Sequence, residues 1–329
     1  MIDHSTMRLG KRPRRHDPRT LMLARYLKGA LPPAPSSVDY TRGITDWGLM
    51  LNDQLGCCTI AAAAHAVQTW TANAGNQEIT FPDPVILDYY KTWDGYNPAD
   101  PFTDQGGVEL NVLNDWRQQG FAGQTLDAYA AIDLGTHDTG NGTGENSNPQ
   151  RVSIVPNPEV MDAIWLFGGA YIGVELPITA QNQDVWDIDA QDSQDSTPGS
   201  WGGHAVYLVG YDSGTATPGG ASAQAGVPVL PNPGPDDETP VTTPSLSAPP
   251  LLNQEGSFAG PSPVSCVPCP GTLTCITWGQ LKKMTWAWFA KYCSEAYALV
   301  SKDWIEATGI SPSGFDLAAL EDDLKQVTG

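Results

Sequence analysis

The chain has 329 residues, of which 40% are hydrophobic and 11 are tryptophan, a composition typical of a globular protein with a large core. Its formal net charge of −20 argues against general nucleic-acid binding. No apolar run approaches the roughly 18 residues of a membrane span, and the N-terminus lacks the apolar core of a secretory signal. The default expectation is a cytoplasmic protein without nucleic-acid or membrane partners.

Residues 1–35 are expected to form a basic N-terminal arm. Residues 1–28 hold eight Lys or Arg against two Asp, which gives this segment a charge of +6 and leaves −26 for the rest of the chain. Opposite charges in one chain favour docking of the arm on its own acidic body over use as a nucleic-acid or partner tail. A short helix is expected over 18–27, followed by a proline-rich stop.

Residues 36–329 are expected to form the main domain, and its first part, about 50–120, is expected to be a helical lobe. A turn from Asn52 to Gly56 runs directly into an alanine-rich stretch, which marks the start of a helix. The elements expected in this part are a short strand over 38–40 and helices over 58–71, 84–90 and 108–119.

From about 121 to 300, strands are expected to dominate. The expected elements are a strand over 125–129, a helix over 158–167, strands over 170–176 and 202–212, and a strand and turn over 274–279. An acidic loop is expected over 185–201, an undecided strand or short helix over 285–300, and a terminal helix over 316–327. Residues 213–270 contain 13 of the 28 prolines and no basic residue, which predicts a low-complexity mobile insertion. Helices followed by strands predict an α+β fold whose two lobes face each other across a groove.

The six cysteines form no recognisable disulfide or zinc framework. Cys266 and Cys269 are a lone CxxC pair, and a zinc site usually needs a second pair at matching spacing, so no metal or cofactor is expected. Cys58 stands at the expected helix start, among unpaired backbone N–H groups and at the positive end of the helix dipole. That position favours a nucleophilic thiolate. The alternative is a small buried hydrophobe.

Of the five histidines, His204 is the best candidate for a base that serves Cys58. His65 lies seven residues after Cys58, about 10.5 Å along the helix axis, so it is expected to be a helix-surface or semi-buried residue. His137 lies in a glycine-rich loop and is expected to be solvated, while the remaining two are in the arm. His204 opens a strand after two glycines, which let another chain come close. Its alternative is a structural role.

The order of several motifs resembles that of papain-like cysteine peptidases. The segments that carry the resemblance are V-D-Y at 38–40, N-D-Q-L-G-C-C-T at 52–59, G-G at 106–107, G-H-A-V at 203–206, V-G-Y at 209–211 and T-W-G at 277–279. In that family the pattern is V-D-W, Q-x-x-x-G-S-C-W-A, G-G, H-A-V-x-x-V-G-Y and N-S-W-G. The resemblance covers about residues 36–300 without the insertion, and it implies a helical lobe that carries Cys and a β-barrel-like lobe that carries His.

The resemblance implies roles for matching residues. Cys58 is implied as the nucleophile and His204 as general base and later general acid. Asn52 takes the place of the glutamine that donates to the oxyanion, with Gln54 as a fallback, and the Cys58 N–H is the second donor. The Gly106-Gly107 pair is implied to bind substrate backbone; its alternative is a plain loop.

Two residues depart from the family pattern. Thr59 replaces the tryptophan that follows the nucleophile, and Ile276 replaces the asparagine that orients the imidazole. Isoleucine cannot make that hydrogen bond, which leaves the Thr277 hydroxyl, the Asp212 carboxylate or a backbone carbonyl as orienter. Trp278 matches the tryptophan that shields this bond from water, or else is a core residue.

The sequence therefore predicts a cysteine peptidase that cleaves a peptide or protein substrate through a thioester intermediate. One alternative is a catalytically impaired papain-like scaffold with a binding or structural role, since Ile276 removes the usual orienter. Another is a cysteine amidase or acyl transferase that acts on a non-protein substrate. The arm is expected to be a structural strap, with a short propeptide that crosses the groove as the alternative.

Overall fold

The computed structural model describes residues 4–27, 31–74, 77–135, 156–189, 191, 193–214, 271–308 and 315–328. All of the expected insertion except its first two residues lies outside these ranges, and so do His137, Cys266 and Cys269. None of the described helices is long and apolar enough to cross a membrane.

A mostly antiparallel sheet forms the centre of the described structure. Its strands are β1 (Ser37–Asp39), β2 (Ala128–Ala131), β3 (Ala170–Leu176), β4 (Val185–Trp186), β5 (Gly202–Asp212), β6 (Thr272–Thr277), β7 (Gln280–Thr285) and β8 (Cys293–Val300). The strand order is β2-β8-β3-β5-β6-β7-β4, and β1 pairs with β5. Only the β4–β7 pair is parallel among the described strands. The long strand β5, which carries His204, therefore lies in the middle of the sheet.

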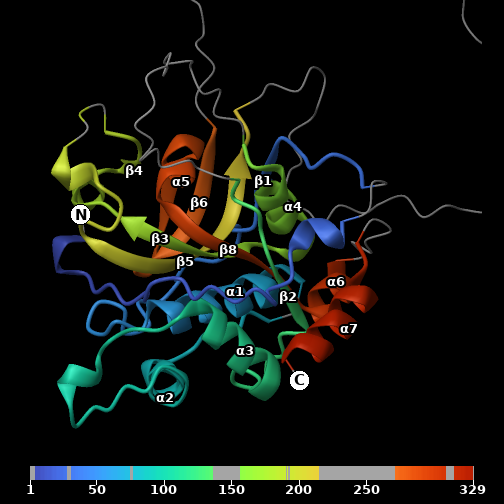
Figure 1. Cartoon of the computed structure of the whole chain (residues 1–329), viewed down its shortest axis with the longest axis horizontal. Helices are drawn as coiled ribbons and strands as arrows, with labels where there is room; N and C mark the ends of the chain where they lie inside the picture. The colour runs from blue at the N-terminus through green and yellow to red at the C-terminus, as the bar shows by residue number, and fades with distance from the viewer. Residues whose placement is uncertain are drawn as a thin grey trace, which may run out of the picture.

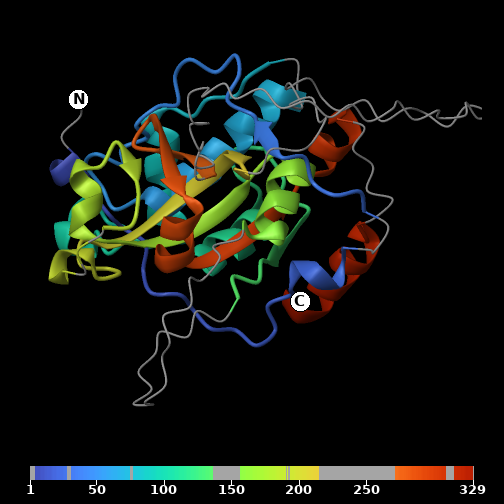
Figure 2. The same ribbon diagram turned by 90° about the horizontal axis from the view of Figure 1, so that it is seen from above.

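Helices lie on both sides of this sheet. They are α1 (Cys58–Ala74), α2 (Asp83–Trp93), α3 (Glu109–Gln119), α4 (Pro158–Phe167), α5 (Trp286–Tyr292), α6 (Lys302–Thr308) and α7 (Leu317–Thr328). In Figure 1, α1, α2 and α3 lie below β3 and β5, whereas α4 and α5 lie above them. Figure 2 shows the same elements from above. The structure confirms the expected α+β fold, in which a helix carries Cys58 and a sheet carries His204.

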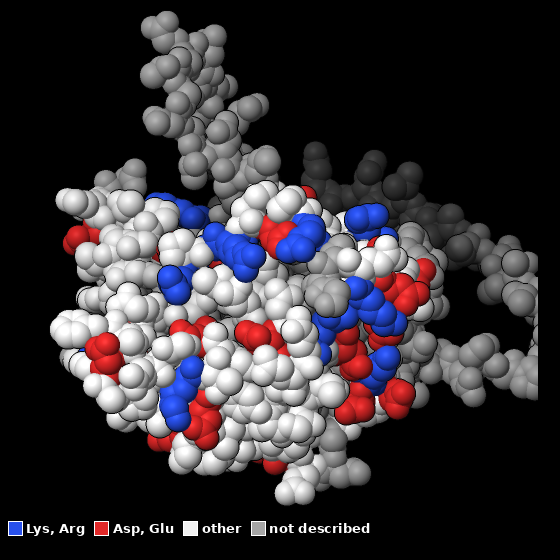
Figure 3. Space-filling view, turned by 60° about the horizontal axis from the view of Figure 1, so that its bottom comes forward, with Lys and Arg blue, Asp and Glu red and all other residues white. Residues whose placement is uncertain are grey.

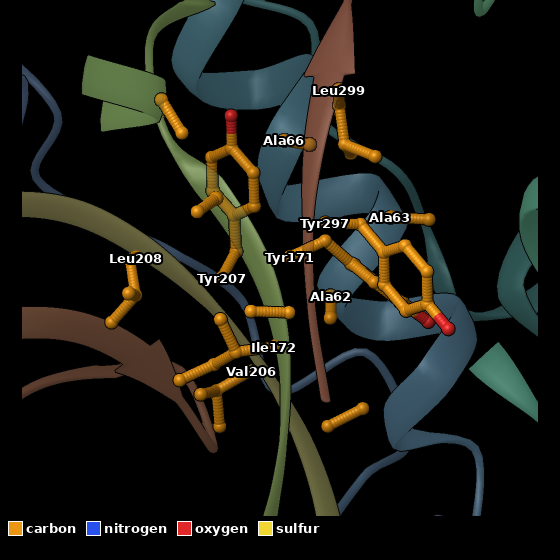
Figure 4. Close-up of a cluster of buried hydrophobic side chains, with 14 of the residues drawn as sticks. Ala62, Ala63, Ala66, Tyr171, Ile172, Val206, Tyr207, Leu208, Tyr297 and Leu299 are labelled. Atoms are coloured by element: carbon orange, nitrogen blue, oxygen red, sulfur yellow. The ribbon is translucent and has the colours of Figure 1, made fainter. Parts of the chain in front are cut away.

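Helix α1 packs directly against the sheet because its contact face is made of small side chains. Thirteen of its 17 residues are buried. Figure 4 shows Ala62, Ala63 and Ala66 of α1 facing side chains from β3, β5 and β8. The Tyr171 hydroxyl on β3 donates to the Thr59 carbonyl at 2.9 Å, which ties the first turn of α1 to the sheet. This close packing brings the N-terminus of α1 next to β5.

Several element predictions are confirmed, and others need correction. The helix over 158–167 and the strands over 170–176 and 202–212 have the predicted bounds, and the other expected helices of the main domain differ only at their ends. The undecided segment 285–300 forms α5 and β8, the acidic loop contains the short strand β4, and α6 was not predicted. The strand over 125–129 was placed too early, since β2 begins at Ala128.

The prediction of a helix over 18–27 is wrong. Only Leu23–Arg25 forms a short 3-10 helix. The N–H of Ala131, on β2, donates to the Leu21 carbonyl at 2.8 Å, and Met22 pairs with Ala131 in a β-bridge. Pairing with β2 thus takes the backbone groups that a helix would need. Pairing with β2 therefore outweighs the helix propensity of this segment.

The prediction that the arm docks on the body of the chain is confirmed for its described residues. Arg15 Nη1 donates to Asn111 Oδ1 at 3.0 Å, and Lys11 Nζ lies 2.9 Å from Glu175 Oε1. Basic and acidic side chains also lie beside each other on the face shown in Figure 3. The arm is therefore part of the folded structure along most of its length.

Candidate active site

Cys58 begins α1, as the sequence predicted, and its side chain is buried against β5. Its sulfur accepts a hydrogen bond from the Ala205 N–H at 3.4 Å. Ala205 directly follows His204, so the close packing of α1 on the sheet brings the helix start to within one residue of the histidine. The two segments that the sequence singled out thus meet in space.

The His204 ring is held by the two residues that follow Ile276. Its Nε2 lies 2.8 Å from Thr277 Oγ1, and its ring stacks on Trp278 with centroids 4.6 Å apart and an interplanar angle of 20°. Thr277 is therefore the residue that contacts the ring where the family pattern has asparagine one position earlier. Asp212 is exposed at the far end of β5, where its carboxylate accepts the Gly214 N–H at 2.8 Å, so it does not orient the ring.

The other ring nitrogen of His204, Nδ1, is buried and has no hydrogen-bond partner among the described residues. The cysteine sulfur and the imidazole thus share one buried cluster without a direct hydrogen bond between them. An unpartnered buried nitrogen is costly, and a nearby acid that can give up a proton would satisfy it.

The two candidate oxyanion donors have different environments. Asn52 lies in the turn before α1 and is only 3% exposed, and its amide donates to the Leu55 carbonyl at a long 3.4 Å. Gln54 is exposed. A buried amide that makes one weak bond can turn to a new acceptor, whereas an exposed glutamine must first leave water. Asn52 therefore remains the better candidate.

The arm passes beside Cys58, between Gly107 and Gly203; these flanking segments are called the cleft below. The Gly107 N–H donates to the Gly10 carbonyl at 2.8 Å, and the Arg12 N–H donates to the Gly107 carbonyl at 2.8 Å. On the other side, the Lys11 N–H donates to the Gly203 carbonyl at 3.0 Å. A Cβ at Gly106 would overlap the Gly10 carbonyl, and one at Gly203 would overlap the Lys11 carbonyl. The glycine pair thus permits an extended peptide to lie in this cleft.

Burial makes both members of the candidate pair uncharged while the arm is docked. Burial raises the pKa of the Cys58 thiol to about 12, although hydrogen bonds from the Ala205 and Gly10 N–H groups act in the opposite direction. Burial lowers the pKa of His204 to about 3, with a smaller contribution from His65. The prediction of a thiolate, made from the helix dipole, is therefore wrong for this state, because the loss of water raises the pKa more than the dipole lowers it.

His65 is buried and not on the helix surface, which corrects the sequence prediction. It is 3% exposed, and its Nε2 lies 2.9 Å from the Trp47 carbonyl oxygen. Burial lowers its pKa to about 4. Helix α1 is buried on nearly all sides, so a polar residue on it has no surface to occupy.

Three glutamates near the cleft were not predicted from the sequence as part of the site. Glu109 is fully buried at the start of α3, Glu295 is 1% exposed on β8, and Glu175 on β3 is partly exposed. Lys11 Nζ lies 2.9 Å from Glu175 Oε1 and 3.2 Å from Glu295 Oε1. These residues are far apart in the sequence, and a local motif does not link them. A carboxylate in an otherwise apolar strand such as β3 or β8 was the available signal.

Comparison with known proteins gives matches at the level of structure alone. No family model and no curated protein sequence matches the chain. The solved structures that match include xylellain, a cysteine protease from Xylella fastidiosa, at 11% identity, covering 90% of this chain and 97% of that one, with a TM-score of 0.49. The cysteine protease and lectin-like domains of Cwp84 from Clostridium difficile match at 10% identity, 91% and 56% coverage, and a TM-score of 0.45.

A third match is a structure that concerns antibody cross-reactivity between the mite allergens Blo t 1 and Der p 1. It has 12% identity, covers 85% of this chain and 76% of that one, and has a TM-score of 0.40. All three TM-scores are below 0.5. The proposals that follow therefore depend on the geometry of the site and not on these similarities.

Proposed function

We propose that the chain is a cysteine peptidase in which Cys58 and His204 hydrolyse peptide bonds of a peptide or protein substrate. The observation that carries this proposal is the docked arm. Its residues Gly10 to Arg12 lie extended between Gly107 and Gly203, with hydrogen bonds on both sides, beside the Cys58 sulfur. A cleft that binds this chain's own backbone as a strand offers the same hydrogen bonds to a substrate.

The site contains the groups that acyl transfer needs. His204 takes the thiol proton as the Cys58 sulfur forms a bond to the substrate carbonyl carbon, and Asn52 and the Cys58 N–H donate to the resulting oxyanion. When the C–N bond breaks, His204 gives its proton to the leaving amine. Water, activated by the same imidazole, then attacks the thioester and releases the acid and the free thiol.

The docked arm is held in an unreactive arrangement. The Gly10 group that contacts the Cys58 sulfur is an N–H and not a carbonyl carbon, so the nucleophile has no electrophile to attack. The Lys11–Gly107 bridge is parallel, which fixes the direction in which the arm runs. Hydrolysis of another chain therefore requires the arm to leave the cleft, which also returns water to the thiol and the imidazole.

The test is labelling of Cys58 by a peptide with a thiol-reactive electrophile. We expect labelling faster than that of free cysteine, and its loss in His204→Ala. Cys57→Ser is the matched control, because Cys57 is a neighbouring buried thiol whose sulfur donates to the Met50 carbonyl at 3.3 Å. This variant should keep the labelling rate of the wild type. Labelling that survives in Cys58→Ser contradicts the proposal.

A catalytically impaired scaffold is the second candidate, and two observations favour it. Ile276 stands where the family pattern has the orienting asparagine, and burial keeps both Cys58 and His204 uncharged in the docked state. A scaffold predicts that Cys58 reacts no faster than free cysteine even when the arm is displaced. The labelling experiment thus separates the two candidates directly.

A further inference from the structure

Lys11 is a buried cation within the arm. Its side chain is 0% exposed, and its ammonium group contacts the carboxylates of Glu175 and Glu295. A lysine loses its hydration when buried, so it remains there only when acidic partners replace the water. The arm segment around it is otherwise exposed, since the side chains of Arg12, Arg14 and Arg15 face water. Lys11 is therefore the basic residue of this segment whose charged group is buried in the body of the chain.

The pocket that holds Lys11 is built by an irregularity in the sheet. The register between β3 and β8 shifts after Gly173, and Ser294 is the extra residue. Glu295 then lies opposite Gly173, while Glu175 lies opposite Gly203 on the other neighbour of β3. These four positions share one face of the sheet, because paired residues and residues two apart point the same way. That face is the one on which the arm lies.

The shape of the pocket fits an unbranched side chain. A Cβ at Gly173 would overlap Cε and Cδ of Lys11, so glycine is needed where the methylene stem passes. The Ser294 hydroxyl lies 3.2 Å from both Glu175 Oε1 and the Gly173 carbonyl oxygen, at the end of the stem. The methylene stem of Lys11 thus passes close to the Gly173 backbone, and its ammonium group lies at the carboxylates.

A third acid, Glu109, lies beside the pocket. Both oxygens of Glu109 are buried and accept no hydrogen bond from the described residues. Burial and the nearby Glu295, which also shares a side-chain hydrogen bond with it, raise the pKa of Glu109 and favour its neutral form, while Lys11 acts in the opposite direction. An apolar or acidic occupant would leave the buried Glu295 carboxylate, and the partly exposed Glu175 beside it, without a counter-ion, which is unfavourable. The pocket therefore selects a cation.

We propose that this acidic pocket is the substrate-specificity pocket, that it selects a lysine side chain in the substrate peptide, and that Lys11 occupies it in the arm-docked state. The inference rests on the proposed peptidase function and deepens it. Lys11 lies opposite Gly107 and next to Gly10, which contacts the Cys58 sulfur. A peptide strand laid against Gly107 in place of the arm puts the residue opposite that glycine over the same pocket.

The experiment uses the full chain with Lys11→Met, which removes the competing ammonium and keeps an unbranched stem. Three peptide electrophiles that differ only at the pocket position, carrying lysine, norleucine or glutamate, are compared by their rate of Cys58 labelling. We expect lysine to react about a hundredfold faster than norleucine, as for other buried charge pairs, with glutamate slowest. The wild-type chain gives the same ratio, because its arm competes equally with each probe.

Pocket variants localise the effect. Glu295→Gln and Glu175→Gln should each reduce the preference for lysine over norleucine by about tenfold or more. The matched control is Asp88→Asn on α2, whose side chain is 72% exposed and lies outside the described cleft contacts, and which should keep the full preference. A preference that survives in both pocket variants overturns the assignment.

A binding measurement separates this inference from the proposed function. A free peptide with the sequence of residues 4–15, and its norleucine form at the position of Lys11, are titrated into the Lys11→Met chain. Equal affinities for the two peptides, or equal labelling by all three probes, overturn the pocket. Tighter binding of the lysine peptide without labelling by any probe supports the pocket and overturns the peptidase.

Discussion

The two halves of the cleft bury polar groups in opposite ways. Around Cys58 and His204, burial removes charge, since the pKa of the thiol rises to about 12 and that of the imidazole falls to about 3. A few ångströms along the arm, Lys11 keeps its charge because Glu175 and Glu295 surround it. The same loss of water thus gives a neutral pair where counter-ions are absent and an ion cluster where they are present.

This difference assigns separate tasks to the two halves. The charged half supplies the side-chain contacts that hold the arm and, by our inference, a lysine of the substrate. By our proposal, the neutral half supplies the reacting groups, which stay unreactive until the arm leaves and water returns. Changes in the charged half should therefore alter docking, and changes in the neutral half should alter reactivity.

The largest effect is expected in the charged half. Lys11→Ala should weaken arm docking by about 3–5 kcal/mol, because it leaves buried carboxylates without their counter-ion. Hydrogen exchange at the Gly107 and Arg12 amides, both bonded in the docked state, should become much faster. The reaction of Cys58 with a small alkylating reagent should speed up as well. Unchanged exchange at both amides would show that Lys11 does not hold the arm.

The buried, uncharged imidazole of the neutral half should make the unfolding free energy depend on pH. The pKa of His204 is lowered to about 3, whereas an unfolded histidine has a pKa of about 6.5. The unfolded chain therefore takes up the proton first, so the stability present above pH 6.5 is lost as the pH falls toward 3. Between pH 6.5 and 5, wild type should lose about 2 kcal/mol more unfolding free energy than His204→Gln. Parallel pH curves in urea denaturation would contradict a buried neutral imidazole.

A smaller effect is expected at the bond between His204 and Thr277. Thr277→Val keeps the shape of the side chain and removes the hydroxyl that lies 2.8 Å from Nε2. We expect the rate of Cys58 labelling by a peptide electrophile to fall about tenfold, because the ring loses its orienting partner. Thr277→Ser restores the hydroxyl and should recover most of the rate. A full rate in the valine variant would mean that Trp278 stacking alone positions the ring.

The smallest effects are expected in the exposed part of the arm. Arg15→Ala removes a hydrogen bond to Asn111, and Arg19→Ala removes an ion pair with Asp17 in which the arginine side chain is 62% exposed. Each should change arm docking by less than about 1 kcal/mol, since water and salt screen such contacts. Measured in the same exchange experiment, an effect as large as that of Lys11→Ala would remove the contrast between buried and exposed charges.

The sequence was sufficient for the features that depend on local pattern. The alanines after Cys58 predicted the helix that begins there, and the run from Gly202 to Asp212 predicted a strand with its bounds. The charge asymmetry predicted that the arm docks on an acidic body. Each of these features follows from periodicity or composition within one segment.

The features that the sequence analysis missed depend on segments that meet only in the fold. The acidic pocket joins Glu175 and Glu295 across a register shift at Gly173 and adds Glu109 from α3, an arrangement that no pattern along the chain marks. The thiolate prediction failed because the arm and β5 bury Cys58 beyond what the helix start implies. Residues 18–27 likewise do not form the expected helix, because they pair with β2. In each case tertiary contacts override the local preference.

The most direct test of the central claim is detection of an acyl-enzyme on Cys58. The Lys11→Met chain is mixed with a lysine-containing peptide substrate, quenched in acid at short times and analysed by mass spectrometry of the peptide that contains Cys58. We predict a transient mass increase equal to the acyl half of the substrate, absent in Cys58→Ser, together with release of the amine half. Cleavage that persists in Cys58→Ser, or an intact substrate over a folded chain with a free cleft, would contradict the account.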